Sequence, residues 1–307
     1  MYLKGFSYAI LLGSMLMPMA GCNSETKHPT QVIAHRGASA DAPENTMAAF
    51  RLAAEKKAPW FELDCTLSLD GDVVVIHDDT LDRTTPLKGK VMETPTAEIT
   101  KADAGSWKDP KFSEEMVPLL SETLDYAKGT IGVYIEIKNS DNDSALITEI
   151  LALQETDTAF TTDQLKDVLS RIEKSDSQNL KLTRKVIQQV KDRNMGTEIV
   201  IQSFSPIVCA VALIEAPELR TELLASEDRK RPELWTNYLR WVQLLDVPGF
   251  NINKNSVTSE LVETMHAQGR TVAVWTVDGE SEMQKLQAMN VDFIITNKPG
   301  VALNILN

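Results

Sequence analysis

The stretch Val32-Ile33-Ala34-His35-Arg36-Gly37 places a short apolar run directly before a histidine and an arginine. A similar arrangement follows at Trp60-Phe61-Glu62-Leu63-Asp64, and a third at Val73-Val74-Val75-Ile76-His77-Asp78. Short runs rich in β-branched and aromatic residues are typical of buried strands. An α/β scaffold carries its chemistry at the carboxyl ends of such strands, so the three stretches predict one active site assembled from several strands.

Strand and helix signals alternate along the rest of the chain. Beyond the first strands at 32–35, 60–64 and 73–77, further strands are expected at 131–138, 198–202, 220–224 (the weakest signal), 249–253, 271–276 and 292–296. Helices are expected at 44–56, 119–128, 145–194 with an interruption near 156–162, 206–215, 233–245, 258–268, 280–289 and 301–306. This pattern predicts the α/β class and a (β/α)₈ TIM barrel, with a polar insertion at 78–118 after the second strand.

The composition limits the partners of the chain. Its 307 residues carry a formal net charge of −13 at pH 7, and so acidic a protein repels nucleic acid, which we exclude as a partner. An anionic substrate would need local cations, which Arg36, Lys138 or a bound metal could provide. Cys65 and Cys209 lie far apart without metal-like or disulfide spacing, so both are expected to be buried and unpaired.

The N-terminus has the pattern of an export signal. Lys4 precedes an apolar run at 8–20 that is too short to span a bilayer comfortably. The run ends in Met19-Ala20-Gly21-Cys22, which is similar to a bacterial lipobox and implies a signal peptide over 1–21 and lipid modification of Cys22. An ordinary signal peptide with an incidental cysteine is the alternative. With a polar tether at 22–30, the domain at 31–307 is expected to be exported and anchored to a membrane surface, at the periplasmic face or outer membrane of a bacterium.

Three carboxylates are candidate metal ligands. Glu62 and Asp64 lie two residues apart on one strand and therefore share a face, and the same alternation aligns Glu136 with Lys138. Glu62, Asp64 and Glu136 would form an all-oxygen site for one divalent cation, Ca²⁺ or Mg²⁺. Considered singly, the first pair could be ordinary strand-end charges, and the second could be a simple ion pair.

The order of the motifs resembles that of the glycerophosphodiester phosphodiesterase family over nearly the whole chain after the signal. Asn297-Lys298 stands where an Asp-Arg pair is frequent in that family, and residues 155–179 look like extra sequence. The matching motifs are His35-Arg36-Gly37, Pro43-Glu44-Asn45-Thr46, Glu62-Leu63-Asp64, Asp70-Gly71, His77-Asp78, Leu81-Asp82-Arg83-Thr84-Thr85, Ile135-Glu136-Ile137-Lys138 and Gln202-Ser203-Phe204.

The resemblance implies a phosphoric diester hydrolase that converts glycerophosphodiesters to glycerol 3-phosphate and an alcohol. His35 and His77 would serve as general acid and base, in an order that the sequence leaves open. The remaining assignments are phosphate binding by Arg36 and Lys138, an apolar wall against glycerol carbons formed by Phe204 and Trp275, and a Lewis-acidic cation on Glu62, Asp64 and Glu136. Phe204 and Trp275 could instead simply pack the top of the barrel.

Three other interpretations remain open from the sequence. The first is phospholipase D-like activity on lysophospholipids, with the same catalytic set and a wider apolar mouth. The second is a surface lipoprotein that acts in binding or adhesion, which the retention of both histidines and all three carboxylates argues against. The third is another metal-dependent barrel enzyme, such as one that acts on carbohydrate, although Arg36 and Lys138 beside two histidines suit phosphate better than sugar.

Overall fold

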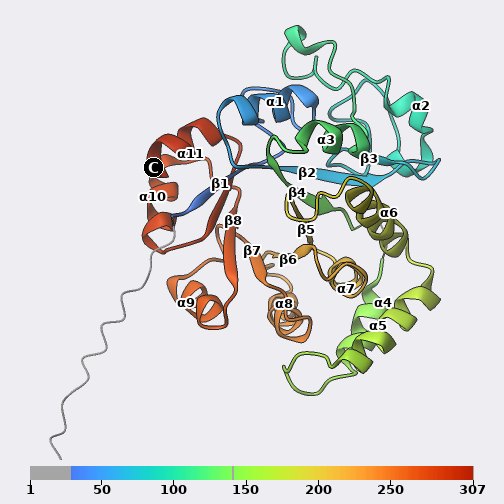
Figure 1. Ribbon diagram of the computed structural model, residues 1–307, viewed down its shortest axis with the longest axis vertical. Helices are drawn as coiled ribbons and strands as arrows, with labels where there is room; N and C mark the ends of the chain where they lie inside the picture. Colours follow the sequence, from blue (N-terminus) through green and yellow to red (C-terminus); the bar gives the residue numbers. More distant parts are fainter. Residues whose placement is uncertain (1–28, 140–141, 307) are drawn as a thin grey trace, which may run out of the picture.

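The computed structural model describes residues 29–139 and 142–306, and these form a closed barrel of eight parallel strands (Figure 1). Strand β1 pairs with both β2 and β9, which closes the barrel. The predicted (β/α)₈ TIM barrel is confirmed. The parallel strands are β1 (Gln31–Ala34), β2 (Trp60–Leu67), β4 (Gly132–Ile137), β5 (Ile199–Ser203), β6 (Arg220–Ala225), β7 (Gly249–Asn253), β8 (Thr271–Trp275) and β9 (Phe293–Thr296).

Helices surround the barrel (Figure 1). They are α1 (Met47–Glu55), α3 (Leu120–Ala127), α4 (Ser144–Leu151), α5 (Thr162–Ser175), α6 (Gln178–Asp192), α7 (Pro206–Glu215), α8 (Pro232–Leu244), α9 (Ser259–Ala267), α10 (Glu280–Ala288) and α11 (Pro299–Leu306). The segment expected to be helical over 145–194 contains three helices, one more than the single predicted interruption allows. The additional break lies at Asp176, whose left-handed backbone ends α5, and at Ser177, whose hydroxyl caps α6.

The second strand is longer than predicted. Residues 65–67 pair with the short antiparallel strand β3 (Val73–Val75) across the Asp70-Gly71 turn. As a result, Glu62 and Asp64 lie within β2 rather than at its end, where the sequence analysis placed Asp64. Their alternation is unaffected, because the strand remains extended through both positions.

The insertion at 78–118 contains little regular structure, as its weak periodicity indicated. It includes α2 (Thr96–Ile99) and two short 3₁₀ helices, η1 (Val91–Glu93) and η2 (Pro110–Phe112). Figure 1 shows α2 beside β3, at one side of the barrel. The insertion packs against the β3 region through a small apolar core that consists of Val74, Ile76, Leu81, Val91, Ile99, Ala104 and Val117.

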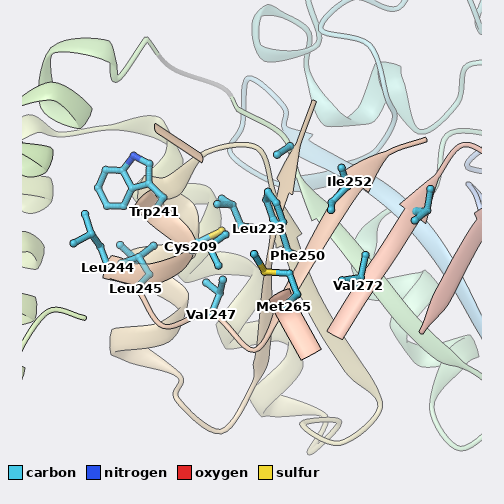
Figure 2. Packing of buried hydrophobic residues seen from close by; sticks show 14 of the residues in the cluster. Cys209, Leu223, Trp241, Leu244, Leu245, Val247, Phe250, Ile252, Met265 and Val272 are labelled. Carbon is cyan, nitrogen blue, oxygen red and sulfur yellow. The ribbon is translucent and has the colours of Figure 1, made fainter. Parts of the chain in front are cut away.

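The main core fills the space between the barrel and its helices. Figure 2 shows Trp241 of α8, with Phe250 and Ile252 of β7, in this layer. Trp241 is 1% exposed, so this side chain packs in the core and does not line a site. Cys65 and Cys209 are buried and, within the described residues, free of disulfides, as predicted. Across the same residues, no helix combines the length and apolarity needed to cross a membrane.

Candidate active site

Three buried carboxylates lie together inside the barrel. The register of β2 with β4 sets Asp64 opposite Glu136, and Glu62 shares the inward face of β2 with Asp64. All three residues are at most 8% exposed, and one ligand oxygen from each lies within 4.8 Å of the others. Burial, with Asp64 and Glu136 nearby, raises the pKa of Glu62 well above its usual value. This cluster could hold a metal ion, as the sequence predicted.

Arg36 and Lys138 neutralise part of this charge. Lys138 Nζ lies 2.7 Å from Glu136 Oε1 and 3.4 Å from Asp64 Oδ1. Arg36 Nε lies 3.2 Å from Asp64 Oδ2, and the Arg36 backbone N–H donates to Glu62 Oε2 at 2.8 Å. Although burial opposes it, the proximity of Lys138 and Arg36 lowers the pKa of Asp64 to about 2. Asp64 is therefore kept ionised by its two cationic neighbours. The negative charge on Glu62 is less fully neutralised by them.

A chain of ion pairs extends from the cluster to the insertion. Arg36 donates to Glu44 at 2.8 Å, and Arg83 donates to Glu44 at 2.8 Å through each of two nitrogens. Arg83 Nε also donates to Asp78 Oδ2 at 2.6 Å. Glu44 thus orders the loop, as the sequence interpretation allowed, and Arg83 fixes Asp78 relative to Arg36.

Asn45 supports the carboxylate cluster, although the sequence analysis assigned it no role beyond starting a helix. It adopts a left-handed backbone conformation with φ of 57°, and its amide donates to Asp64 Oδ2 at 2.8 Å. Asn tolerates this backbone region better than most residues. Its presence in the matched Pro43-Glu44-Asn45-Thr46 motif was the available signal.

His35 is held by an amide. It follows β1, and its Nδ1 lies 2.7 Å from Asn297 Oδ1. The Asn297 amide nitrogen donates to Asp278 Oδ2 at 2.6 Å, which turns the amide oxygen toward His35. His35 must then carry its proton on Nδ1, and Nε2 retains a lone pair. Enclosure by the protein and the nearby Arg36 lower the pKa of His35 to about 4, so His35 is neutral at pH 7.

His77 is held by a carboxylate instead. Its Nδ1 lies 2.6 Å from Asp78 Oδ1. The hydrogen bond from Arg83 and that from His77 keep the pKa of Asp78 far below its ordinary value, so Asp78 is an anion. Because the Asp78 carboxylate can only accept a hydrogen bond, His77 carries a proton on Nδ1. The His77 side chain is 33% exposed and can exchange protons with the cavity.

A cavity of about 90 Å³ unites these groups. Phe204 and Trp275 form one wall, with ring centroids 5.4 Å apart and planes at 89°. Asp64 is not part of the lining and lies behind Arg36 and Lys138. The cavity is lined by His35, Arg36, Glu62, His77, Glu136, Lys138, Gln202, Phe204, Leu224, Trp275, Thr276 and Ile295. Two histidines, two cations and a carboxylate cluster around one small cavity suit acid–base chemistry on an anionic ester.

Similarity to known proteins agrees with this chemistry. A family model described as the glycerophosphoryl diester phosphodiesterase family matches residues 35–301. The chain belongs to this family. As predicted, it is an enzyme of the phosphoric diester hydrolase class. The phosphodiesterase is 33% identical, over 278 residues, to a glycerophosphodiester phosphodiesterase of Caldanaerobacter subterraneus, a match that covers 90% of this chain and 98% of the relative.

Solved structures show the same fold. A phosphodiesterase from Oleispira antarctica, in complex with the product sn-glycerol-3-phosphate, is 25% identical with a TM-score of 0.68, covering 90% of this chain and 96% of that one. A glycerophosphodiester phosphodiesterase from Agrobacterium tumefaciens is 28% identical with a TM-score of 0.66, covering 90% and 99%. The phosphodiesterase therefore shares its whole barrel with these enzymes.

Cys22, with the export signal, and His28 fall outside the described residues. His266 of α9 has a structural contact instead, because its Nε2 lies 2.8 Å from Asp292 Oδ2. The same carboxylate oxygen accepts from the Val272 backbone at 2.7 Å, so this pair fastens the start of β9 to α9 and β8.

Proposed function

We propose that this phosphodiesterase hydrolyses glycerophosphodiesters to glycerol 3-phosphate and an alcohol. The observation that carries the proposal is the convergence of two differently held histidines, Arg36, Lys138, Glu62 and Glu136 on one cavity of about 90 Å³, with Asp64 directly behind it. The substrate class is supported by the glycerol 3-phosphate product in the Oleispira neighbour. It is supported as well by the activity for which the Caldanaerobacter relative is named.

We propose that Glu62, Asp64 and Glu136 hold one divalent cation, Ca²⁺ or Mg²⁺. Their ligand atoms are all oxygen, which hard cations prefer. The raised pKa of Glu62 reflects its burial and the negative charge of Asp64 and Glu136, which Arg36 does not fully offset, and a divalent ion would relieve that charge. When bound, such an ion supplies a Lewis acid to the phosphodiester.

The hydrogen-bond partners of the histidines support different proton roles. His35 presents an unprotonated Nε2, because Asn297 fixes its proton on Nδ1, so it accepts the proton of the attacking hydroxyl or water. His77 has the ionised Asp78 behind it and donates a proton to the departing alcohol oxygen as the P–O bond breaks. Each transfer moves one proton, and the pair returns to its starting state by exchange with solvent.

The remaining cavity residues bind the substrate. Arg36 and Lys138 donate charge-assisted hydrogen bonds to the phosphate oxygens. Phe204 and Trp275, which pack edge to face at 5.4 Å, place an apolar surface against the glycerol carbons. The small cavity volume favours a short glycerol moiety over an acylated one.

The test is an assay of the purified protein, supplemented with Ca²⁺ or Mg²⁺, against glycerophosphocholine, glycerophosphoethanolamine and lysophosphatidylcholine. Release of sn-glycerol 3-phosphate from the first two is the expected result. Turnover of lysophosphatidylcholine alone would favour the phospholipase D-like alternative. No turnover of any of the three, by a folded and metal-loaded protein, would contradict the proposal.

We also propose that the protein is exported and anchored to a membrane surface through a lipid on Cys22. The support is the apolar run at 8–20 and the small residues that precede the cysteine. Radiolabelled fatty acid should be incorporated by the full chain expressed in a bacterium and not by Cys22→Ser. Equal labelling of both proteins would contradict the anchor and leave the enzymatic assignment intact.

A further inference from the structure

Gln202 is a cavity residue whose role the acid–base chemistry does not explain. It lies on β5, between Glu136 of β4 and Glu222 of β6 in the register of the sheet. The side chain is 1% exposed and lines the cavity beside Lys138 and Phe204. A primary amide has a donor end and an acceptor end, so its orientation determines which kind of group the substrate meets.

Asn251 of β7 takes up the acceptor end of Gln202. The Asn251 amide nitrogen donates to Gln202 Oε1 at 2.7 Å, and Asn251 is fully buried. Within the described part of the chain, this is the one side-chain hydrogen bond recorded for Gln202. The Gln202 amide nitrogen is therefore left for the cavity.

Glu222 of β6 is a second polar neighbour of Asn251. Arg220 Nε donates to Glu222 Oε1 at 2.6 Å, and Glu222 is a hydrogen-bonding neighbour of Asn251. Yet Glu222 Oε2 and Asn251 Oδ1 are both buried acceptors that find no donor among the described residues.

A glycine leaves room for the Glu222 side chain on the neighbouring strand. Gly249 lies directly opposite Glu222 on β7, and a Cβ at this glycine would come within 2.6 Å of the Glu222 carboxyl group. Burial raises the pKa of Glu222, although Arg220 and the hydrogen bond with Asn251 oppose the shift. The fully buried Asn251 therefore has Gln202 and Glu222 as its polar neighbours.

We propose that Asn251 is a positioning residue that holds the Gln202 amide nitrogen toward the substrate, where it donates a hydrogen bond to a phosphate oxygen. The inference rests on the proposed function, since it assigns Gln202 to the phosphate of a glycerophosphodiester. Phosphate oxygens only accept hydrogen bonds, so the opposite orientation of Gln202 would face them with a second acceptor. A neutral N–H beside Lys138 binds the anion without adding charge to the carboxylate cluster.

The direct test is the affinity for sn-glycerol 3-phosphate, measured by calorimetry and by competitive inhibition in the presence of Mg²⁺. Gln202→Met removes the amide and should weaken binding by ~10–100-fold, the usual effect of losing a hydrogen bond to a charged group. KM for glycerophosphocholine should rise by a similar factor, with a smaller change in kcat. The affinity for glycerol, which lacks the phosphate, should not change.

The positioning role is tested by a double-mutant cycle. Asn251→Asp, whose ionised carboxylate accepts but cannot donate, should turn Gln202 around and weaken glycerol 3-phosphate binding by ~10-fold or more. Asn251→Ala serves the same purpose without a buried charge, should Asn251→Asp fail to fold. Combined with Gln202→Met, either variant should bind no more weakly than Gln202→Met alone, because Asn251 acts only through Gln202.

Ile252→Val is the matched control, because Ile252 neighbours Asn251 on β7 but belongs to the outer core (Figure 2). It should lower the melting temperature and leave affinity unchanged. Unaltered glycerol 3-phosphate affinity in Gln202→Met, or additive losses in the cycle, would overturn the inference. Failure of the wild-type enzyme to turn over any glycerophosphodiester would instead contradict the proposed function.

Discussion

The two histidines that line the cavity have unlike surroundings. His35 is backed by the neutral amide of Asn297, whereas His77 is backed by the carboxylate of Asp78. Each partner accepts a hydrogen bond and so fixes the proton of its imidazole on Nδ1, but the amide is neutral whereas the carboxylate of Asp78 is an anion. Two similar sequence motifs therefore differ in proton chemistry because of what lies behind each ring. This difference is the basis of our proposal that His35 is the base and His77 the acid.

The largest expected effect comes from removing the cation that both histidines would work beside. Exhaustive chelation should abolish turnover, and Ca²⁺ or Mg²⁺ should restore it. Glu62→Gln should weaken metal affinity more than folding, because it keeps the shape of the side chain and removes one charge. Calorimetric titration of the chelated protein, alongside the activity assay, measures both. Full activity of metal-free protein would exclude the carboxylate cation site. Catalysis would then depend on the histidines and the basic residues alone.

Removal of either histidine should be nearly as damaging. His35→Ala and His77→Ala should each lower kcat by at least ~10²-fold, the usual contribution of a general acid or base. The two variants should differ with a substrate whose leaving group is a nitrophenol, since a good leaving group needs no acid. His77→Ala should then recover most of its activity and His35→Ala should not. Equal losses on that substrate would contradict the assigned roles.

Exchanging the amide behind His35 for a carboxylate should shift the pH profile. In the double variant Asn297→Asp with Asp278→Asn, the new carboxylate at position 297 faces His35. The new amide at position 278 can still hydrogen-bond to it. A facing anion favours the imidazolium and should raise the pKa of His35 from about 4 by ~1–3 units. His35 serves as a base only when neutral, so the acid limb of kcat/KM should move to higher pH. Asp278→Asn alone is the control, and an unmoved limb in the double variant would contradict the role of His35.

The smallest effect is expected at Arg83, which lies outside the cavity and orders Asp78 and Glu44. Its side chain is 44% exposed, so Arg83→Gln should cost less than ~1 kcal/mol of folding stability, as exposed ion pairs usually do. Turnover should fall only several-fold, because Asp78 keeps its contact with His77. Thermal unfolding and kcat measured together check this, and a loss as large as that of His77→Ala would make Arg83 a direct participant.

The fold was accessible from the sequence because its signals are local. The alternation of short apolar runs with amphipathic segments depends on neighbouring residues, and it predicted every strand of the barrel. The extension of β2 to Leu67 was missed because it depends on pairing with β3. The break of the long helical segment at Asp176 was missed as well, since a left-handed aspartate is not distinctive in sequence.

The sequence by itself determined the barrel, the candidate metal ligands and the histidine, arginine and lysine residues of the cavity. Alternation along a strand is enough to place Glu62 beside Asp64. Only the tertiary structure decided what each of these groups can do. Closure of β1 against β9 brings Asn297 to His35 across 262 residues of chain, and the barrel interior brings Asn251 to Gln202. A proton role or an amide orientation depends on such contacts, because hydrogen-bond partners far apart in the chain leave no periodic signal in it.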